Sequence, residues 1–420
     1  MRNFRPQICA ALSLAATSSL ALAQAPSSSA VPVTVDNYIR AQSDIYFGQT
    51  VKAGAFGKFR HGRELAPIDR RLIIRPNRDT LYSLAVFDFD AGPVTVMLPN
   101  AGKHFMVMQV TNEDQYTRAV YYGAGNHTLT KEGVGTRFGI VVVRALVDPA
   151  NPQDVQQVHA LQDALKVSQQ GPGTFDIPNW DEPSLKKVRV ALLQLGETIS
   201  DTKRMFGANK DQVDPVRHLV GTALVWGGLP AKDGLYLPVM PARNDGTAIH
   251  KLTVKDVPVD GFWSITVYNA EGYFEPNHYN AYSVNNITAK KGADGSVAVQ
   301  FGGCESEIPN CLPIMKGWNY TVRLFRPRPE ILDRTWKFPE AQPVNCPTPV
   351  KQLALRRLWL GQRFFTKFPK KINRVKLSDN RDRNRVNSEI RNPIWISEAS
   401  SSHTRQPMAP PAREAAANRM

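Results

Sequence analysis

The sequence predicts a mainly β protein in which two β-rich units are joined by a helical segment. Three observations support this prediction. Short strand-like runs broken by Gly, Pro, Asn and Asp fill the region before residue 150, helical apolar spacing follows it, and strand-like runs return after residue 247. Short strands separated by turn residues favour a sandwich or barrel over a parallel α/β sheet.

The N-terminus has the features of a cleavable export signal. Arg2 and Arg5 precede an apolar run over residues 8–22, and Ala21-Leu22-Ala23 has the small-x-small pattern of a cleavage site. The run is shorter than the stretch of about 20 apolar residues that spans a bilayer. We therefore predict a signal peptide over residues 1–23 and a periplasmic or secreted protein with no other membrane span, while an uncleaved N-terminal anchor is the alternative.

The first β unit is predicted over residues 33–150. Its strand candidates are continuously apolar or alternate between apolar and polar residues, and they cover residues 81–89, 94–98, 104–110 and 137–147. Asp90-Ala91-Gly92-Pro93 and Pro99-Asn100-Ala101-Gly102 supply the turn residues between the first three runs.

Residues 151–246 are predicted to be helical and to cover or link the β units. A first helix begins at Asn151-Pro152, carries an apolar stripe as far as Leu165, and is ended by Gly171-Pro172-Gly173. A second helix follows Pro183, with Ser184 or Asp181 as its cap, and a third covers residues 216–225.

The second β unit is predicted over residues 247–344, with strands at 249–254, 262–268, 297–301 and 320–325. An oxidising compartment permits disulfides, and Cys9 leaves with the signal. Cys304 and Cys311 flank a short polar loop that a disulfide could close, and two free thiols are the alternative. Cys346 has no obvious partner.

The net charge of +15 is concentrated at the ends of the chain. Residues 347–420 hold 16 lysines and arginines against 5 aspartates and glutamates, whereas residues 24–346 hold 34 against 32. We therefore expect no nucleic-acid binding through the folded body. The 347–420 segment lacks sustained periodicity and is expected to be a disordered basic tail, although residues 353–368 could form a basic amphipathic helix at a lipid surface.

Several motifs resemble a pair of families of unknown function. The stretches resembling DUF1254 are Arg75 to Ser83, Asp88 to Asp90 and Met108 to Asp114. Those resembling DUF1214 are Gly261 to Tyr268, Gly272-Tyr273, Asn280 to Ser283, Leu324 to Pro327 and Thr335 to Lys337. The resemblance covers residues 33–344. It implies an exported bacterial protein built of two jelly-roll-like sandwiches, a double jelly roll, that assembles as a homotrimer and has no established activity.

The densest polar cluster is the run Arg75, Asn77, Arg78, Asp79 and Tyr82. It predicts either a turn that leads into the first strand, closed by an Arg–Asp pair, or a ligand site. In the ligand site, the two arginines would donate to an anionic or sugar-like molecule, Asp79 would orient an arginine and Tyr82 would stack.

A second cluster, Asn112, Glu113, Asp114 and Tyr116, follows a predicted strand. Loops at strand ends often carry function, so the two carboxylates are candidates for acid–base work or Ca²⁺ binding. A solvated acidic turn is the alternative.

No standard nucleophile, zinc or phosphate-loop motif is present, and the histidines of the body are scattered singly. We therefore expect no cofactor and no metal site. Whether the chain is an enzyme stays open. The sequence favours an exported oligomer that binds a small molecule, a glycan or a protein partner; the alternative is a hydrolase-like enzyme that uses residues 75–82 and 112–116 in one pocket.

Overall fold

The computed structural model describes residues 29–69, 74–306 and 308–344, and these residues form a mainly β structure with helices, as predicted. The predicted strands at 94–98 and 297–301 are found at those residues. The other predicted strands begin and end within two residues of the predicted bounds.

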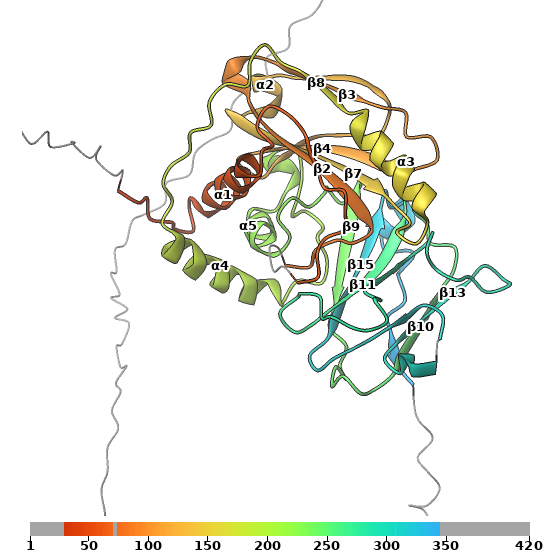
Figure 1. The fold of residues 1–420 in the computed structure, drawn as a ribbon. Helices are drawn as coiled ribbons and strands as arrows, with labels where there is room; N and C mark the ends of the chain where they lie inside the picture. Colours follow the sequence, from red (N-terminus) through yellow and green to blue (C-terminus); the bar gives the residue numbers. More distant parts are fainter. Residues whose placement is uncertain (1–28, 70–73, 307, 345–420) are drawn as a thin grey trace, which may run out of the picture. The chain divides into compact units, whose positions relative to one another are not determined.

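The first β unit is a sandwich of two antiparallel sheets (Figure 1). The larger sheet has the order β1-β2-β7-β4-β5, with strands β1 (Arg60–His61), β2 (Thr80–Asp88), β7 (Phe138–Leu146), β4 (Met106–Asn112) and β5 (Thr117–Tyr121). The smaller sheet has the order β6-β3-β8, with strands β6 (Gly125–Leu129), β3 (Val94–Leu98) and β8 (Lys166–Ser168).

Both faces of the larger sheet are covered, which explains why β4 and β7 are buried along their whole length. One face packs against β3 and β6 through a core that includes Val96, Val110 and Val143. The opposite face of β7 packs Ile140 against Phe47 of helix α1 (Tyr38–Lys52). Strands covered on both faces are mainly apolar, so the nearly continuous apolar runs of the sequence follow from this packing, and buried polar residues within them such as Gln109 and Arg144 need hydrogen-bond partners.

The second β unit is also a two-sheet sandwich. Its sheets have the orders β12-β11-β15-β9 and β14-β13-β10-β16. The strands are β9 (Gly234–Val239), β10 (His250–Val254), β11 (Trp263–Tyr268), β12 (Ser283–Asn285), β13 (Val297–Phe301), β14 (Cys311–Leu312), β15 (Asn319–Phe325) and β16 (Gln342–Pro343). Trp318, Tyr320 and Phe301 fill the core between the sheets and are fully buried.

The two β units share one strand order. The series β2-β7-β4-β5 corresponds to β9-β15-β11-β12, and β6-β3-β8 corresponds to β13-β10-β16. Every pairing among these strands is antiparallel, and among the strands of the described residues only β1 and β14 lack a counterpart. The chain therefore contains the same β topology twice, and positions in one unit can be compared with positions in the other.

Three helices pack together beside the larger sheet of the first unit, as Figure 1 shows: α1, α4 (Glu182–Gly196) and α5 (Pro215–Leu224). Each of α4 and α5 has an aspartate at its N-cap and a proline in its first turn. Of the two caps predicted for α4, Asp181 is the N-cap: its side chain accepts a hydrogen bond from the Ser184 backbone N–H of the first turn at 2.9 Å.

The structure contains short strands that the sequence did not predict, such as β5 and β6, and it also differs from the prediction in three longer parts. Helix α3 (Pro152–Asp163) ends before the predicted Gly171, because β8 follows it and pairs with β3. Strand β9 lies in the segment predicted to be helical and pairs with β15. Helix α1 was not predicted.

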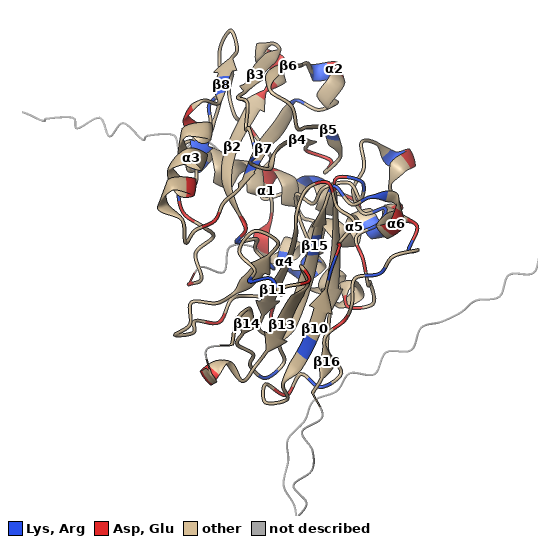
Figure 2. Ribbon diagram, turned by 90° about the vertical axis from the view of Figure 1, so that its right-hand side faces the viewer, with Lys and Arg blue, Asp and Glu red and all other residues tan. Residues whose placement is uncertain are grey.

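Cys304 and Cys311 form a disulfide with Cα atoms 5.6 Å apart, so the predicted pairing is confirmed. In the part of the chain that the structure describes, no helix is both long and apolar enough to span a membrane. The predicted signal at 1–23, Cys346 and the 347–420 segment lie outside the described residues. Within them, acidic and basic residues are interspersed along the ribbon of both β units (Figure 2).

Candidate functional site

The repeated topology places a Tyr–Arg pair at the same position in each β unit. Tyr82 on β2 is paired in register with Arg144 on β7. Tyr236 on β9 is paired with Arg323 on β15, which are the corresponding strands of the second unit. The two Tyr–Arg pairs lie on corresponding strands, so the repeated topology, rather than one local motif, determines where they lie.

The two arginines hold the units together reciprocally. Arg144 is 7% exposed and donates to Gly227 O, in the segment before β9, at 2.9 Å. Arg323 is 4% exposed and donates to Arg75 O, in the segment before β2, at 2.8 Å. Each arginine thus binds the backbone that leads into the other unit.

Each arginine also has a polar partner on the neighbouring strand of its own sheet. Arg144 donates to Gln109 Oε1 on β4 at 2.7 Å, and Arg323 donates to Thr266 Oγ1 on β11 at 2.8 Å. Arg323 also donates to the Tyr268 hydroxyl at 2.6 Å. These bonds fix the planes of both guanidinium groups and explain how two charged side chains are kept in an interior position.

A buried aspartate directly precedes each of the corresponding strands β2 and β9 and forms a third contact between the units. Asp79 Oδ1 accepts from Ser283 Oγ and Asn285 Nδ2 on β12, at 3.2 and 3.1 Å. Asp233 Oδ1 accepts from the Tyr122 hydroxyl, directly after β5, at 3.0 Å. Strands β5 and β12 correspond, so each aspartate accepts hydrogen bonds from the equivalent region of the other unit.

A cavity of about 100 Å³ lies between these paired strands. Its lining includes both Tyr–Arg pairs from the sheets, together with residues of α1, α4, α5 and the segments before β2 and β9. Four arginines line it: Arg75, Arg144, Arg189 and Arg323. The carboxylate in the lining is Asp201, which is already paired with Arg217 at 2.8 Å and with Arg334 at 2.9 Å.

Two of the four arginines keep unpaired donors. Among the described residues, neither Arg75 Nε nor Arg189 Nε has a hydrogen-bond partner, although both atoms are buried. None of the four arginines has a described carboxylate oxygen within 4.0 Å. Burial lowers the pKa of Arg75, and the like charge of Arg323 adds to this effect. Buried cations without a counter-ion are costly, so the cavity is electrostatically suited to an anion.

An aromatic wall closes one side of the cavity. Tyr46 of α1 and Trp226 both line it, with ring centroids 4.7 Å apart. Burial raises the pKa of the Tyr46 hydroxyl, while Arg189 opposes this effect. Tyr46 thus remains a neutral hydrogen-bonding group beside Arg189.

The structure brings some residues of the first predicted cluster to this cavity and not others. Arg75, Asn77 and Tyr82 line it. Arg78 points elsewhere: it donates to Ala66 O, and its guanidinium lies over the rings of Phe274 and Tyr282, 5.7 and 5.2 Å from their centroids.

Asp79 and Asn77 form part of the turn that leads into β2. Asn77 Oδ1 accepts from the Asp79 backbone N–H at 2.9 Å, and Asn77 Nδ2 donates to Thr80 Oγ1 at 3.1 Å. Asp79 forms no ion pair with Arg75 or Arg78 among the described residues, because its carboxylate faces β12.

The second predicted cluster lies outside the cavity lining. Asn112 Oδ1 accepts from the backbone N–H groups of Asp114 and Tyr116, at 3.1 and 2.9 Å, and so shapes the turn between β4 and β5. Asp114 pairs with Arg40 at 2.6 Å, and the Tyr116 ring stacks on His218 with centroids 4.9 Å apart. The two clusters therefore do not meet in one pocket, which the hydrolase-like alternative required.

Sequence reasoning did not identify Arg144, Arg189 and Arg323. Arg144 and Arg323 are each the single charged residue of their strand, and Arg189 is one of several charged residues of α4. One signal was present. Asp79-Thr80-Leu81-Tyr82 and Asp233-Gly234-Leu235-Tyr236 share the pattern Asp-x-Leu-Tyr, and they begin the corresponding strands β2 and β9. Among the described residues, no group of three or more His, Cys, Asp or Glu side chains is placed to hold a metal ion.

The fold and the site define a protein of two β sandwiches with a common strand order, joined across an arginine-lined cavity. Comparison with known families identifies its parts. The model described as "Protein of unknown function (DUF1254)" matches residues 56–135, and the one described as "Protein of unknown function (DUF1214)" matches residues 241–329. The predicted resemblance, with DUF1254 N-terminal and DUF1214 C-terminal, is confirmed.

Two solved structures are similar to this chain. The VPA0106 protein of Vibrio parahaemolyticus is 17% identical, with a TM-score of 0.56 over 74% of this chain and 98% of that one, which supports a common fold. An uncharacterized protein of Burkholderia cenocepacia is 14% identical, with a TM-score of 0.38 over 70% of this chain and 84% of that one. No curated protein matches the chain.

Proposed function

We propose that this protein binds a small organic anion of the carboxylate class in the arginine-lined cavity. The observation that carries the proposal is the pair of buried, unpartnered Nε donors of Arg75 and Arg189, in a cavity whose own carboxylate is already paired. A guanidinium offers a planar fork of donors that matches two carboxylate oxygens.

The residues that line the cavity have three different proposed roles. Arg144 and Arg323 hold the two β units in register through their backbone contacts. Arg75 and Arg189 supply the donors to the ligand, and Tyr46 and Trp226 cover it. The described lining includes no histidine, cysteine or free carboxylate that could act as a nucleophile or general base, which favours binding over hydrolysis.

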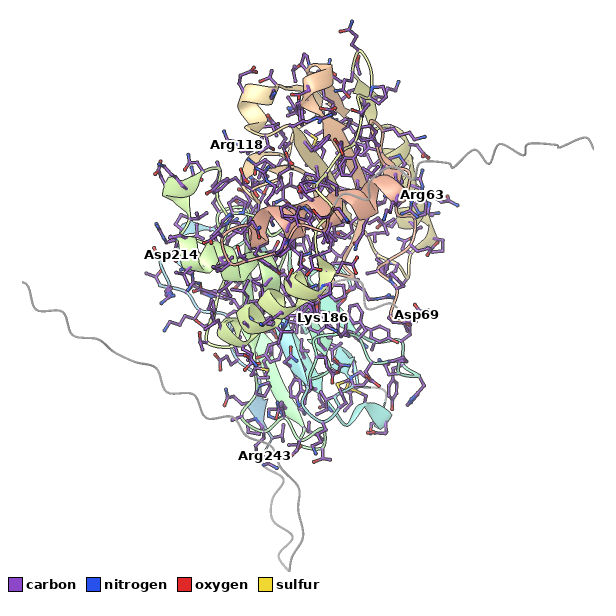
Figure 3. The ribbon with its side chains drawn as sticks, turned by 90° about the vertical axis from the view of Figure 1, so that its left-hand side faces the viewer. Arg63, Asp69, Arg118, Lys186, Asp214 and Arg243 are labelled. Atoms are coloured by element: carbon purple, nitrogen blue, oxygen red, sulfur yellow. A yellow bond between two sulfur atoms is a disulfide. The ribbon has the colours of Figure 1, made fainter. Side chains whose placement is uncertain are left out.

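The test is calorimetric titration of the full chain with sodium butyrate. Wild-type protein is expected to bind, and Arg75→Gln and Arg189→Gln each to weaken binding about tenfold or more, because each loses a charge-assisted hydrogen bond worth about 1.5 kcal/mol or more. Lys186→Gln is the matched control, since Lys186 lies on α4 one turn from Arg189 (Figure 3) and outside the lining. Absence of butyrate binding, or equal loss in the Lys186 variant, overturns the proposal.

We also propose that the protein is exported and acts in the periplasm or outside the cell after removal of residues 1–23. The disulfide Cys304–Cys311 supports an oxidising location, and the absence of a membrane-crossing helix among the described residues is compatible with it. Sequencing of the mature N-terminus should begin at Gln24. A mature chain that begins at Met1 contradicts this prediction.

For the architecture, we propose a double jelly roll that assembles as a homotrimer, with β domains at 33–150 and 247–344, a connecting segment at 151–246 that lends β8 and β9 to the two sandwiches, and a tail at 347–420. The identical strand orders support the pairing of two related β domains. Light scattering of the mature protein is expected to return three times the chain mass, and a monomer mass excludes the trimer.

A further inference from the structure

A second cavity adjoins the arginine-lined one. It has a volume of about 400 Å³ and shares five lining residues with the smaller cavity: Ile74, Arg75, Ile199, Leu224 and Pro238. Because these residues line both spaces, the two cavities lie next to each other at Arg75, and the second is called the vestibule from here on. A ligand held by Arg75 therefore has room to extend beyond the cavity.

The vestibule has mainly apolar walls near the shared residues. Leu193 of α4 and Leu224 of α5 contribute side chains from the helices. Met240, directly after β9, lines the vestibule but not the inner cavity and is 60% exposed. A large exposed methionine at the opening of a cavity is an adaptable contact for an apolar chain.

Basic residues predominate in the inner cavity, whereas acidic residues outnumber basic ones in the vestibule. The inner cavity carries four arginines, whereas the vestibule carries Glu197 and Glu271, both exposed. A ligand with one anionic end is attracted inward, but a second anionic group at its far end would lie beside these two carboxylates. The arrangement favours a monoanion over a dianion.

Resting on the function proposed above, we propose that the ligand is a monoanionic amphiphile: a carboxylate head held by Arg75 and Arg189, with an unbranched apolar body in the vestibule. The head meets the unpartnered donors, and the body covers Leu193, Leu224 and Met240. The ligand class is thus that of medium-chain aliphatic carboxylates rather than of sugars or phosphates.

The test compares acetate, butyrate and octanoate by calorimetry on the full chain. Affinity is expected to rise about fourfold per added methylene, which is the fold-change equivalent of ~0.8 kcal/mol per buried CH₂. Octanedioate should bind more weakly than octanoate, and the double variant Glu197→Gln/Glu271→Gln should reduce that difference. Octyltrimethylammonium, which has the same chain and the opposite charge, should not bind.

Two variants test the vestibule itself. Met240→Asp places a carboxylate on the path of the apolar body and should weaken octanoate binding at least tenfold while leaving butyrate binding within twofold. Val216→Asp is the matched control, because Val216 is 64% exposed and lines neither space.

The outcomes separate the two proposals. If no carboxylate of any length binds, or if binding does not depend on Arg75 and Arg189, the function proposed above fails. If carboxylates bind through the two arginines but with equal affinity at every chain length, or if Met240→Asp has no effect on octanoate, only the amphiphile proposal fails.

Discussion

Asp44 is a buried carboxyl group whose position makes the stability of the protein depend on pH. It lies on α1, is 1% exposed, and accepts a hydrogen bond at Oδ2 from Trp180 Nε1 at 2.9 Å. Its other oxygen has no partner among the described residues. Burial raises the pKa of Asp44 to about 7, with Trp180 opposing the rise and Glu113 adding to it.

The sign and size of the effect follow from this shift. The folded state holds a proton on Asp44 up to about pH 7, whereas the unfolded chain releases it near 3.8, so the contribution of Asp44 to stability is fully present at low pH and is lost as pH rises between these values. Each pKa unit corresponds to about 1.4 kcal/mol. Above pH 7 the ionised Asp44 therefore lowers the free energy of unfolding by up to about 4 kcal/mol. Asp44→Asn removes this loss and keeps an oxygen that accepts from Trp180 Nε1.

Guanidinium unfolding followed by circular dichroism at a series of pH values measures the effect. Wild type and Asp44→Asn should be nearly equally stable near pH 4, and the variant should be more stable at pH 8. Asp88→Asn is the control of opposite sign: burial opposes its charge, but hydrogen bonds from Arg137 and the backbone of Thr174 hold the pKa of Asp88 below its usual value. A variant at Asp44 whose advantage does not grow with pH refutes the reasoning.

Three further predictions concern stability and use the same unfolding measurement. Arg323→Met should lower the free energy of unfolding by about 4 kcal/mol and Arg144→Met by about 3, because Arg323 donates three hydrogen bonds of 2.6–2.8 Å whereas Arg144 donates two, at 2.7 and 2.9 Å. The reverse order of the two losses contradicts this reasoning. Replacing both cysteines of the Cys304–Cys311 disulfide by serine should cost about 2.5 kcal/mol on the chain-entropy model, and reducing agent should then have no further effect. Gly246→Ala should lower the free energy of unfolding by at least about 3 kcal/mol and Gly295→Ala by about 1. Both glycines have φ near +80°, but an added Cβ would lie 2.5 Å from a backbone nitrogen at Gly246 and would meet nothing within 4 Å at Gly295. Equal losses would exclude the steric cause.

The β sandwiches were predictable because their strands are apolar runs bounded by turn residues, such as Val94–Leu98 and Val297–Phe301. Helix α1 was not predictable from periodicity, since it buries the polar residues Gln42, Ser43 and Asp44 along with its apolar ones. Strand β9 was missed because it lies at the end of its sheet and contains Pro238 before its final residue. Tertiary pairing with β15, not local propensity, makes it a strand.

The candidate site was predictable where its residues are dense in the sequence and not where the fold assembles them. Arg75 and Tyr82 stand in one short polar run, and both line the cavity. Arg144, Arg189 and Arg323 come from β7, α4 and β15, and their approach depends on how the two units and the helices pack. No short sequence motif can predict that residues from such distant elements will line the same cavity.

The internal repeat separates structural from functional residues around the cavity. The aspartate, tyrosine and arginine of one unit each have a counterpart in the other, so their shared role is to join two equivalent sheets. Arg75 breaks this symmetry: it stands four residues before Asp79, and the residue four before Asp233 is Leu229, a core side chain. Arg189 belongs to a helix outside the repeat. The two arginines that have no counterpart in the repeat are therefore the two that keep unpaired donors, and this coincidence supports the proposed ligand site between them.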